Sequence, residues 1–434
     1  MNTRRQWMKN AGLGAAAAKG FPAIVGGAAL GLNGAVAASD RVTLAIIGVG
    51  GMGTGHINEF AKVAAARVVA VCDVDEEHLA AAKAKVDQKY ANTDCATFRA
   101  YDEVLARTDI DAVSLALPDH WHGLVAVLAA RARKDIYGEK PLAHNFREGL
   151  AICESVRKYG RIWQTGSWQR SRPQFHQACE LVRNGRAGKV KRVEVGLPGG
   201  PFEYKQVLGK MDITEPPKTL NYDRWLGPSP EVPYIEGRVH FHWRWNLDTG
   251  GGQLMDWVGH HVDIAHWGLG FDHTGPLSIE GQGEYPSRDE LWNSARRYRL
   301  TAKYEGGIEM VIAGGHSDIR SGTKWIGDEG WIWVDRSGIQ SEPASLLTSQ
   351  IGPNEIHLVK SAGHYQQFIE CVRSRGLTLT PADVAHRSAT LGWLGQIAML
   401  TGRKIHWDPA NQRIQNDREA EKLLSREMRL PWRL

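Results

Sequence analysis

Residues 250–267, GGGQLMDWVGHHVDIAHW, combine two acids and three histidines with a segment otherwise rich in apolar residues and glycine. On a single α-helix, Asp256, His260, Asp263 and Trp267 would share one face, because they are spaced i, i+4, i+7 and i+11. An imidazole beside a carboxylate can take the proton of a hydroxyl group. The segment therefore predicts one helix with an acid–base face.

The same part of the chain allows two other interpretations. One is a set of buried histidines and acids that only caps a core. The other is a metal site, because several potential ligands are crowded here: His240, His242, His260, His261, Asp263 and His266. These residues lack the spacing of a recognised ligand motif, so we expect no metal.

A glycine-rich turn earlier in the chain has the context of a dinucleotide-binding site. The run RVTLAIIG predicts a buried strand, and GVGGMG leads from it into a helical pattern. Gly48 permits the tight turn, Gly50 lets the backbone approach a pyrophosphate, and Gly53 allows close packing of helix on strand. Gly51 and Met52 stand at the start of the helix, where phosphate groups bind.

An acid after the next predicted strand indicates which dinucleotide binds. The run RVVAVCDVD places Asp73 twenty residues after Gly53 (73 − 53), where a carboxylate accepts hydrogen bonds from the adenosine ribose. Its charge would repel the 2′-phosphate of NADP. We therefore expect NAD as the cofactor.

The strand–helix–strand pattern continues and predicts a doubly wound parallel sheet. DIDAVSLALP and KDIYGEKPL read as further strands, each followed by a loop. Ligands of such sheets bind outside the carboxyl ends of the strands. The loop residues expected to face the cofactor are Pro118, His120, His122, Glu139 and Lys140.

The rest of the chain has the period-two pattern of antiparallel strands. KVKRVEVGL, RRYRLTAKYEGGIEMVIAGG and GWIWVDRSG show it, and two late helical patterns, HYQQFIECVRSRG and VAHRSATLGWLGQIAMLTG, are suited to cover one face of a sheet. We expect an α/β protein with a Rossmann doubly wound parallel sheet in residues 39–165. An α+β domain with a large, mainly antiparallel sheet should follow in 166–434.

Residues 1–38 resemble an export signal. Arg4 and Arg5 precede a long Ala/Gly-rich stretch, and a small-residue run near Ala37 suits a signal peptidase. The arginine pair is typical of the twin-arginine route, so we expect a periplasmic protein. Lys19 interrupts the apolar run, and we expect no stable membrane insertion.

Charge and cysteine content exclude other classes of protein. The formal net charge is +5, and four of these charges lie in the leader, so the remainder is near +1 (5 − 4). Nothing in this balance requires nucleic acid or an anionic membrane as a partner. The five cysteines are odd in number and lack ligand spacing, so neither a disulfide framework nor a zinc site is indicated.

These motifs together resemble the Gfo/Idh/MocA oxidoreductase family over essentially the whole chain after the leader. The resemblance rests on GVGGMG, Asp73, GEKPLA, GGGQLMDWVGHHVDIAHW and HRSATLGWLGQIAMLTGRKIHWDP. It implies that Lys140, Asp256 and His260 are the catalytic residues, and that Asp263 matches the acid three residues further on.

The resemblance implies an NAD(P)-dependent oxidoreductase that acts on a CH–OH group of a sugar or cyclic polyol, by chemistry that needs no metal. His260 would act as the base, and Lys140 would bind the reacting oxygen; which of the two receives the proton first is open. The family also contains redox-neutral enzymes with tightly bound cofactor, NAD-assisted glycosidases and sensors without turnover. We expect a homo-oligomer formed through the C-terminal sheet. The residues expected to contact the substrate are Trp168, Arg170, Trp243, Arg244 and Asp263.

Overall fold

A computed structural model describes residues 36–201, 211–287 and 290–434 of the chain. Almost all of the leader predicted in 1–38 lies outside the described residues. The chain divides into the units Met1–Arg41, with the short helix η3 (Ala38–Asp40), and Val42–Leu434. Within the described ranges, no helix is long and apolar enough to span a membrane.

The first half of the second unit contains a six-stranded parallel sheet with the order β3-β2-β1-β4-β5-β6. Strand order reverses beside β1, which confirms the predicted doubly wound sheet. Its central strands are buried throughout or nearly so, as expected for a sheet covered by helices on both faces. The strands are β1 (Val42–Ile47), β2 (Ala66–Cys72), β3 (Ala96–Phe98), β4 (Ala112–Leu115), β5 (Asp135–Gly138) and β6 (Trp163–Thr165).

The helices between these strands begin directly at the strand ends. Side-chain caps fix two of the starts: Asp75 accepts hydrogen bonds from the amides of Glu77 and His78, and Asn145 accepts one from that of Glu148. The helices are α2 (Gly51–Phe60), α3 (Glu76–Tyr90), α4 (Tyr101–Ala106), α5 (Asp119–Arg131) and α6 (Phe146–Lys158).

A nine-stranded mixed sheet forms the second half, with the order β13-β12-β11-β7-β10-β9-β8-β14-β15. Only the β7–β10 pair is parallel among these described neighbours, so the predicted, mainly antiparallel sheet is confirmed. The strands are β7 (Arg192–Leu197), β8 (Ser278–Glu284), β9 (Arg297–Lys303), β10 (Glu309–Gly314), β11 (Gly322–Ile326), β12 (Trp331–Val334), β13 (Ile339–Glu342), β14 (Ile405–Asp408) and β15 (Arg413–Ile414).

Helices of this half lie in the connections before, between and after the strands. Three matter most for the site: α9 (Gly252–Trp257), the π-helical turn η7 (Val258–Val262) and α10 (Asp263–Leu269). The others are η4 (Trp168–Ser171), α7 (Pro173–Arg183), α8 (Tyr222–Leu226), η5 (Glu236–Arg238), η6 (His240–Trp245), η8 (Glu305–Gly307), η9 (Ala344–Thr348), α11 (His364–Ser374), α12 (Ala382–Thr401) and α13 (Arg418–Lys422).

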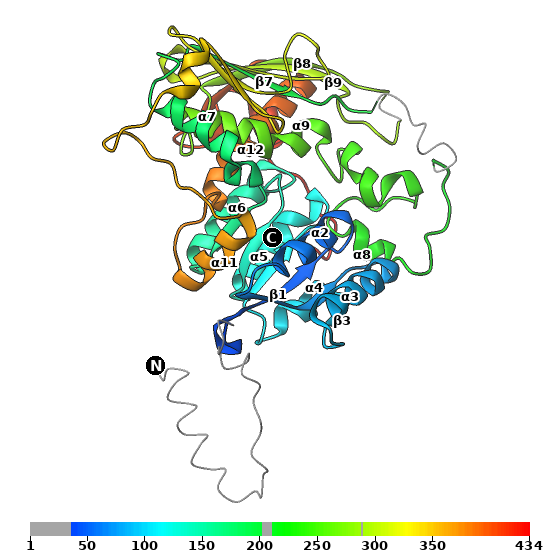
Figure 1. Ribbon diagram of the computed structural model, residues 1–434. Coiled ribbons are helices and arrows are strands. Elements are labelled where there is room, and N and C mark those ends of the chain that lie inside the picture. Colours follow the sequence, from blue (N-terminus) through cyan, green and yellow to red (C-terminus); the bar gives the residue numbers. More distant parts are fainter. Residues whose placement is uncertain (1–35, 202–210, 288–289) are drawn as a thin grey trace, which may run out of the picture. The chain divides into compact units, whose positions relative to one another are not determined.

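The two helices predicted to cover the second sheet take different positions. α12 packs against β8 of that sheet on one side and against α6 on the other, and so joins the two halves (Figure 1). α11 packs instead against α2 and β1 of the parallel sheet. Its Tyr365 stacks on Tyr137 of β5 with 5.0 Å between ring centroids, and this aromatic contact draws the helix away from the second sheet.

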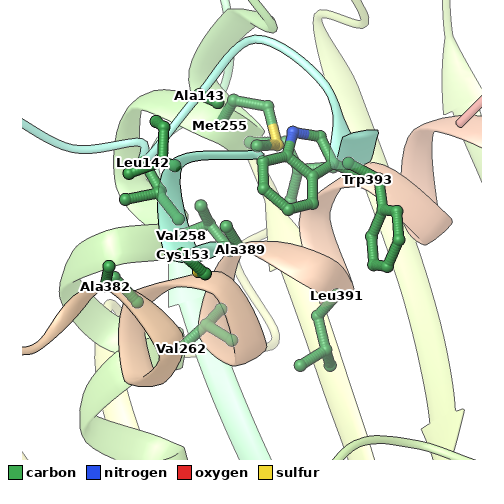
Figure 2. Close-up of a cluster of buried hydrophobic side chains, with 14 of the residues drawn as sticks. Leu142, Ala143, Cys153, Met255, Val258, Val262, Ala382, Ala389, Leu391 and Trp393 are labelled. Carbon is green, nitrogen blue, oxygen red and sulfur yellow. The ribbon is translucent and has the colours of Figure 1, made fainter. Parts of the chain in front are cut away.

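A continuous apolar core runs from the loop after β5 to α12. Its side chains come from that loop, α6, the α9–η7 segment and α12, and they are shown in Figure 2. This packing holds the histidine-rich segment beside the GEKPLA loop. The labelled residues are Leu142, Ala143, Cys153, Met255, Val258, Val262, Ala382, Ala389, Leu391 and Trp393.

Candidate active site

A cavity of about 540 Å³ lies where β1, β2, β4 and β5 end. One wall consists of residues that directly follow these strands, which is where a ligand of a doubly wound sheet binds. The other wall comes from the long connection between β7 and α9. Those residues are Leu220, Arg224, Trp225, His240, Phe241, Trp243 and Arg244.

The glycine-rich turn has the geometry that its sequence predicts. Gly48 has φ +82°, and a Cβ atom there would lie 2.5 Å from the carbonyl oxygen of Ala116. A Cβ atom at Gly53 would lie 1.9 Å from the carbonyl oxygen of Gly48. At Gly51, by contrast, a Cβ atom would meet nothing within 4 Å.

The open side of the turn fits a dinucleotide. A Cβ atom at Gly50 would meet only the ring of His78, at 3.9 Å, and Gly51 and Met52 line the cavity at the start of α2. The backbone is therefore exposed to the cavity at a helix N-terminus, which favours a phosphate group.

Asp73 lies at the end of β2 and lines the same cavity. Its Oδ2 accepts a hydrogen bond of 2.8 Å from the amide of Val49, and its Oδ1 accepts one of 3.0 Å from that of Asp75. Burial raises the pKa of Asp73, while these amides oppose the shift. Each carboxylate oxygen keeps a lone pair that can accept a ribose hydroxyl. Arg99 also lines the cavity, but it pairs with Glu76.

We expect the protein to bind NAD more tightly than NADP by roughly ten- to a hundredfold, because a 2′-phosphate would face the Asp73 carboxylate. Asp73→Ser should reduce this preference, whereas Asp94→Ser, at an exposed position, should not. Calorimetric titration with both nucleotides measures the ratio. Equal affinities in the unmodified protein would remove Asp73 from cofactor selection.

Lys140 stands at the other end of the row of strands, after β5. Its Nζ donates hydrogen bonds to Oδ1 of Asp256 at 2.8 Å and to the carbonyl oxygen of Asp256 at 2.9 Å. Arg244 approaches the same Oδ1 with its Nε at 3.2 Å. Burial alone would raise the pKa of Asp256, but the charges of Lys140 and Arg244 outweigh it and hold that pKa below its usual value. Lys140 and Arg244, which line the cavity, thus share the carboxylate of Asp256.

The π-helical turn changes the face predicted for a single α-helix. The turn holds an additional residue and so rotates everything that follows it. Gly259 lies in the turn, and a Cβ atom there would be only 2.7 Å from Cβ of Lys140. Glycine at this position therefore lets the turn lie directly against the lysine.

His260 is buried within the turn, with 6% of its surface exposed. Its ring meets those of Trp257 and Trp168 at centroid distances of 5.5 and 5.9 Å. Burial, and then the charges of Lys140 and Arg336, hold the pKa of His260 well below its usual value. The imidazole is therefore neutral, and its Nδ1 is buried without a hydrogen-bond partner among the described residues.

Arg170 and Asp263, which we expected to contact substrate, bind each other instead. Nε of Arg170 lies 2.7 Å from Oδ2 of Asp263, and both side chains are almost fully buried. Asp272 accepts further hydrogen bonds from Arg170, and Ser388 donates one to Asp263. The π turn directs Asp263 to this network, so the pair supports the helical segment from outside the cavity.

His120 and His122, expected at the cofactor, bind backbone carbonyl groups. The ring nitrogens of His122 lie 2.8 and 2.7 Å from the carbonyl oxygens of Leu117 and Pro141, so this residue joins the loops after β4 and β5. Nε2 of His120 lies 3.0 Å from the carbonyl oxygen of Trp225, in the opposite wall. Both histidines therefore position the walls of the cavity.

Other predicted residues do line the cavity: Pro118, Glu139, Trp243 and Arg244. Glu139 also lies 3.0 Å from the buried His56. Burial opposes ionisation of Glu139, but the hydrogen bond and charge of His56 hold its pKa below the usual value.

Several site residues escaped the sequence analysis. Asp119 follows Pro118 and is 2% exposed; burial raises its pKa well above the usual value, and it interacts electrostatically with Lys140 and Arg244. Its position after a strand end was the available signal. No signal in the sequence marks Gly259 or Arg336, because their roles depend on contacts with distant segments.

The potential metal ligands noted in the sequence are dispersed in the structure. Nε2 of His266 bonds the hydroxyl of Tyr304 at 2.7 Å, and His261 stacks on Trp257. His240 lies with Asp75 and His78 in a group whose ligand atoms all fall within 4.8 Å of one another, so these three side chains could hold a metal ion. The other histidines of the crowded segment belong to no such group within the described residues.

Comparison with known proteins matches both halves of the chain. Residues 42–167 match the model "Oxidoreductase family, NAD-binding Rossmann fold", and 166–434 match "Oxidoreductase family, C-terminal alpha/beta domain". An inositol 2-dehydrogenase 2 of Saccharopolyspora erythraea is 32% identical over 66% of this chain and 89% of its own. A myo-inositol 2-dehydrogenase of Thermotoga maritima is 27% identical over 45% of this chain.

The alignment with the Thermotoga enzyme spans 58% of that protein. Alignments with two further oxidoreductases, of Bacillus subtilis and Rhizobium meliloti, span 66% and 42% of those proteins. The chain thus covers less than two thirds of each of these three relatives. Among solved structures, the aldose–aldose oxidoreductase of Caulobacter crescentus superposes with a TM-score of 0.62 at 19% identity. The superposition covers 84% of this chain and 99% of that one, and it shows a shared fold.

Proposed function

Because the chain belongs to the Gfo/Idh/MocA oxidoreductase family and has its NAD-binding Rossmann domain, we propose that it oxidises a secondary hydroxyl group of a sugar or cyclic polyol. The observation that carries the proposal is the cluster of Lys140, Asp256 and His260: Lys140 lines the cavity, its Nζ lies 2.8 Å from Oδ1 of Asp256, and the charges of both residues act on His260. Asp256 and His260 are not themselves among the residues that line the cavity. Inositol dehydrogenases among the relatives act on alcohols of this class.

NAD, when bound, accepts the hydride from the carbon that is oxidised. Two of the three N–H donors of Lys140 are taken by Asp256, and the third remains for the reacting oxygen. The ammonium group stabilises the negative charge that develops there. Neutral His260 accepts the hydroxyl proton, and Asp256 holds the lysine in place.

Product analysis with a panel of sugars, polyols and aryl glycosides tests this proposal. Net formation of NADH with a ketone product supports a dehydrogenase. Release of free aglycone without net reduction would instead indicate an NAD-assisted glycoside-cleaving enzyme. Binding without any turnover would indicate a sensor and contradict the assigned chemistry.

The connection between β7 and α9 also favours a tightly held cofactor. The amide of Asn221 bonds the carbonyl of Val74 at 3.0 Å, and that of Glu76 bonds the carbonyl of Thr219 at 3.0 Å. Nε1 of Trp121 bonds the carbonyl of Trp225 at 3.0 Å. This connection is thus fixed to the parallel-sheet half on one side of the cavity. Slow release suits a redox-neutral cycle in a protein exported already folded.

We expect the protein to retain NAD when it is purified without added nucleotide. Denaturation followed by chromatography should release close to one NAD per chain. Trp121→Phe, which removes the bond to the Trp225 carbonyl, should release NAD faster than the unmodified protein. Recovery of cofactor-free protein that turns over only with a continuous supply of NAD would contradict a redox-neutral cycle on bound NAD.

A further inference from the structure

Two arginines lie in a cluster of aromatic rings around His260. The guanidinium groups of Arg172 and Arg336 lie over the ring of Trp168, at 4.5 and 4.6 Å from its centroid. Arg336 also lies 4.6 Å from the centroid of Trp257. Since both tryptophans contact His260, the two cations border the proposed base.

Neither arginine has an acidic partner within salt-bridge distance in the described ranges. Nε and Nη2 of Arg336 approach only the amide oxygen of Gln169, at 3.4 and 3.3 Å. Arg186 of the same half, by contrast, is paired with Glu355. Both side chains over Trp168 are exposed, so water screens the repulsion between the two like charges and leaves both guanidinium groups accessible to an anion.

The charges that act on His260 are also mostly positive, since those of Lys140 and Arg336 face that of Asp256. Lys140 and Arg244 share the single carboxylate of Asp256. Burial raises the pKa of Asp119 and so disfavours its charged form, although Lys140 and Arg244 oppose this shift. With Arg172 and Arg336, the surroundings of His260 therefore carry an excess of positive charge.

We propose that the substrate carries an anionic group, a carboxylate or a phosphate, which binds Arg172 and Arg336 while its hydroxyl group lies at Lys140 and His260. Guanidinium groups bind both anions through paired hydrogen bonds. This inference rests on the proposed oxidation of a sugar or polyol and names its substrate class.

Matched substrates test the inference: glucose against glucuronate, galactose against galacturonate, and each sugar against its phosphate. We expect kcat/KM to favour one anionic series, and the favoured series distinguishes a carboxylate from a phosphate. Arg336→Gln and Arg172→Gln should each lower the ratio of anionic to neutral kcat/KM by roughly 10- to 100-fold, the effect of losing a charged hydrogen bond.

Arg320→Gln is the matched control, because Arg320 also stacks on a tryptophan, Trp333, and bonds Gln340 away from the site. This variant should leave the ratio unchanged. Equal losses on anionic and neutral substrates in the site variants would overturn the inference.

A binding measurement separates this inference from the proposed function. Glucuronate and the sugar phosphates are titrated calorimetrically into NAD-loaded protein, with the neutral sugars as reference. Tighter binding of an anionic series that is lost in Arg336→Gln supports the inference even if no probe is oxidised, in which case the proposed oxidation fails alone. Oxidation of neutral sugars with no preference for any anion would overturn the inference and leave the oxidation standing.

Discussion

Replacement of Lys140 by methionine is expected to lower kcat by roughly 10²- to 10⁴-fold, the scale of a positioned acid–base or charge-stabilising group. Methionine retains the apolar stem that lies against Gly259 but offers no N–H to the reacting oxygen. Asp256 keeps Arg244 at 3.2 Å, so the loss of folding free energy should stay at about 1–3 kcal/mol. Steady-state kinetics with saturating NAD and a melting curve measure the two effects.

Lys158→Met is the control for this substitution, since Lys158 is exposed at the end of α6. It should change neither kcat nor Tm appreciably. Calorimetry should show that Lys140→Met still binds NAD. A Lys140→Met protein that is folded, loaded and as fast as the unmodified one would exclude the lysine from the reaction.

Replacement of His260 by alanine is expected to cost a similar factor in turnover, because the pKa of His260 responds to the charges of both Lys140 and Asp256, as expected for a base beside them. His266→Ala serves as the comparison. His266 is also fully buried, but it bonds Tyr304 and lies after the π turn. That variant should lose stability while the folded fraction keeps its turnover. The opposite ranking of the two variants would show that the base lies elsewhere.

The acid limb of the pH profile of kcat/KM should reflect the pKa of His260. A base acts in its neutral form, so activity falls as pH drops through its pKa, and burial and neighbouring cations hold this pKa well below the usual value. The unmodified protein should therefore remain active at about pH 6.5, where an ordinary histidine is half protonated. Arg336→Gln removes one of these cations and should move the acid limb to higher pH.

Local features were predictable because they depend on neighbours in sequence. The turn at Gly48 and Gly53 and the acid at Asp73 follow from strand–turn–helix chemistry, and the structure places them as expected. The division into a parallel and a mainly antiparallel sheet follows from hydrophobic periodicity. Lys140 and Asp256 lie 116 residues apart, so only the resemblance to a known family predicted that they act together. Their hydrogen bond in the structure supports that prediction.

Features that depend on tertiary packing were not predictable. Nothing in the spacing of Asp263 shows that a π turn directs it to Arg170, because periodicity assumes a regular helix. The connection that closes the cavity has no periodic pattern, and Trp225 reaches His120 only in the folded protein. Arg336 comes from the turn between β12 and β13, far in sequence from the tryptophans it covers.

The π turn gives up regular backbone bonding to gain room for one more residue. Within Val258–Val262 this extra residue lets Gly259 lie against Lys140, while Asp263, after the turn, reaches its buried ion pair with Arg170. A regular α-helix with one residue fewer would leave the side chains after the turn close to their present directions. Deletion of one residue from the turn should therefore spare the ion pair of Asp263 and disturb the contact with Lys140.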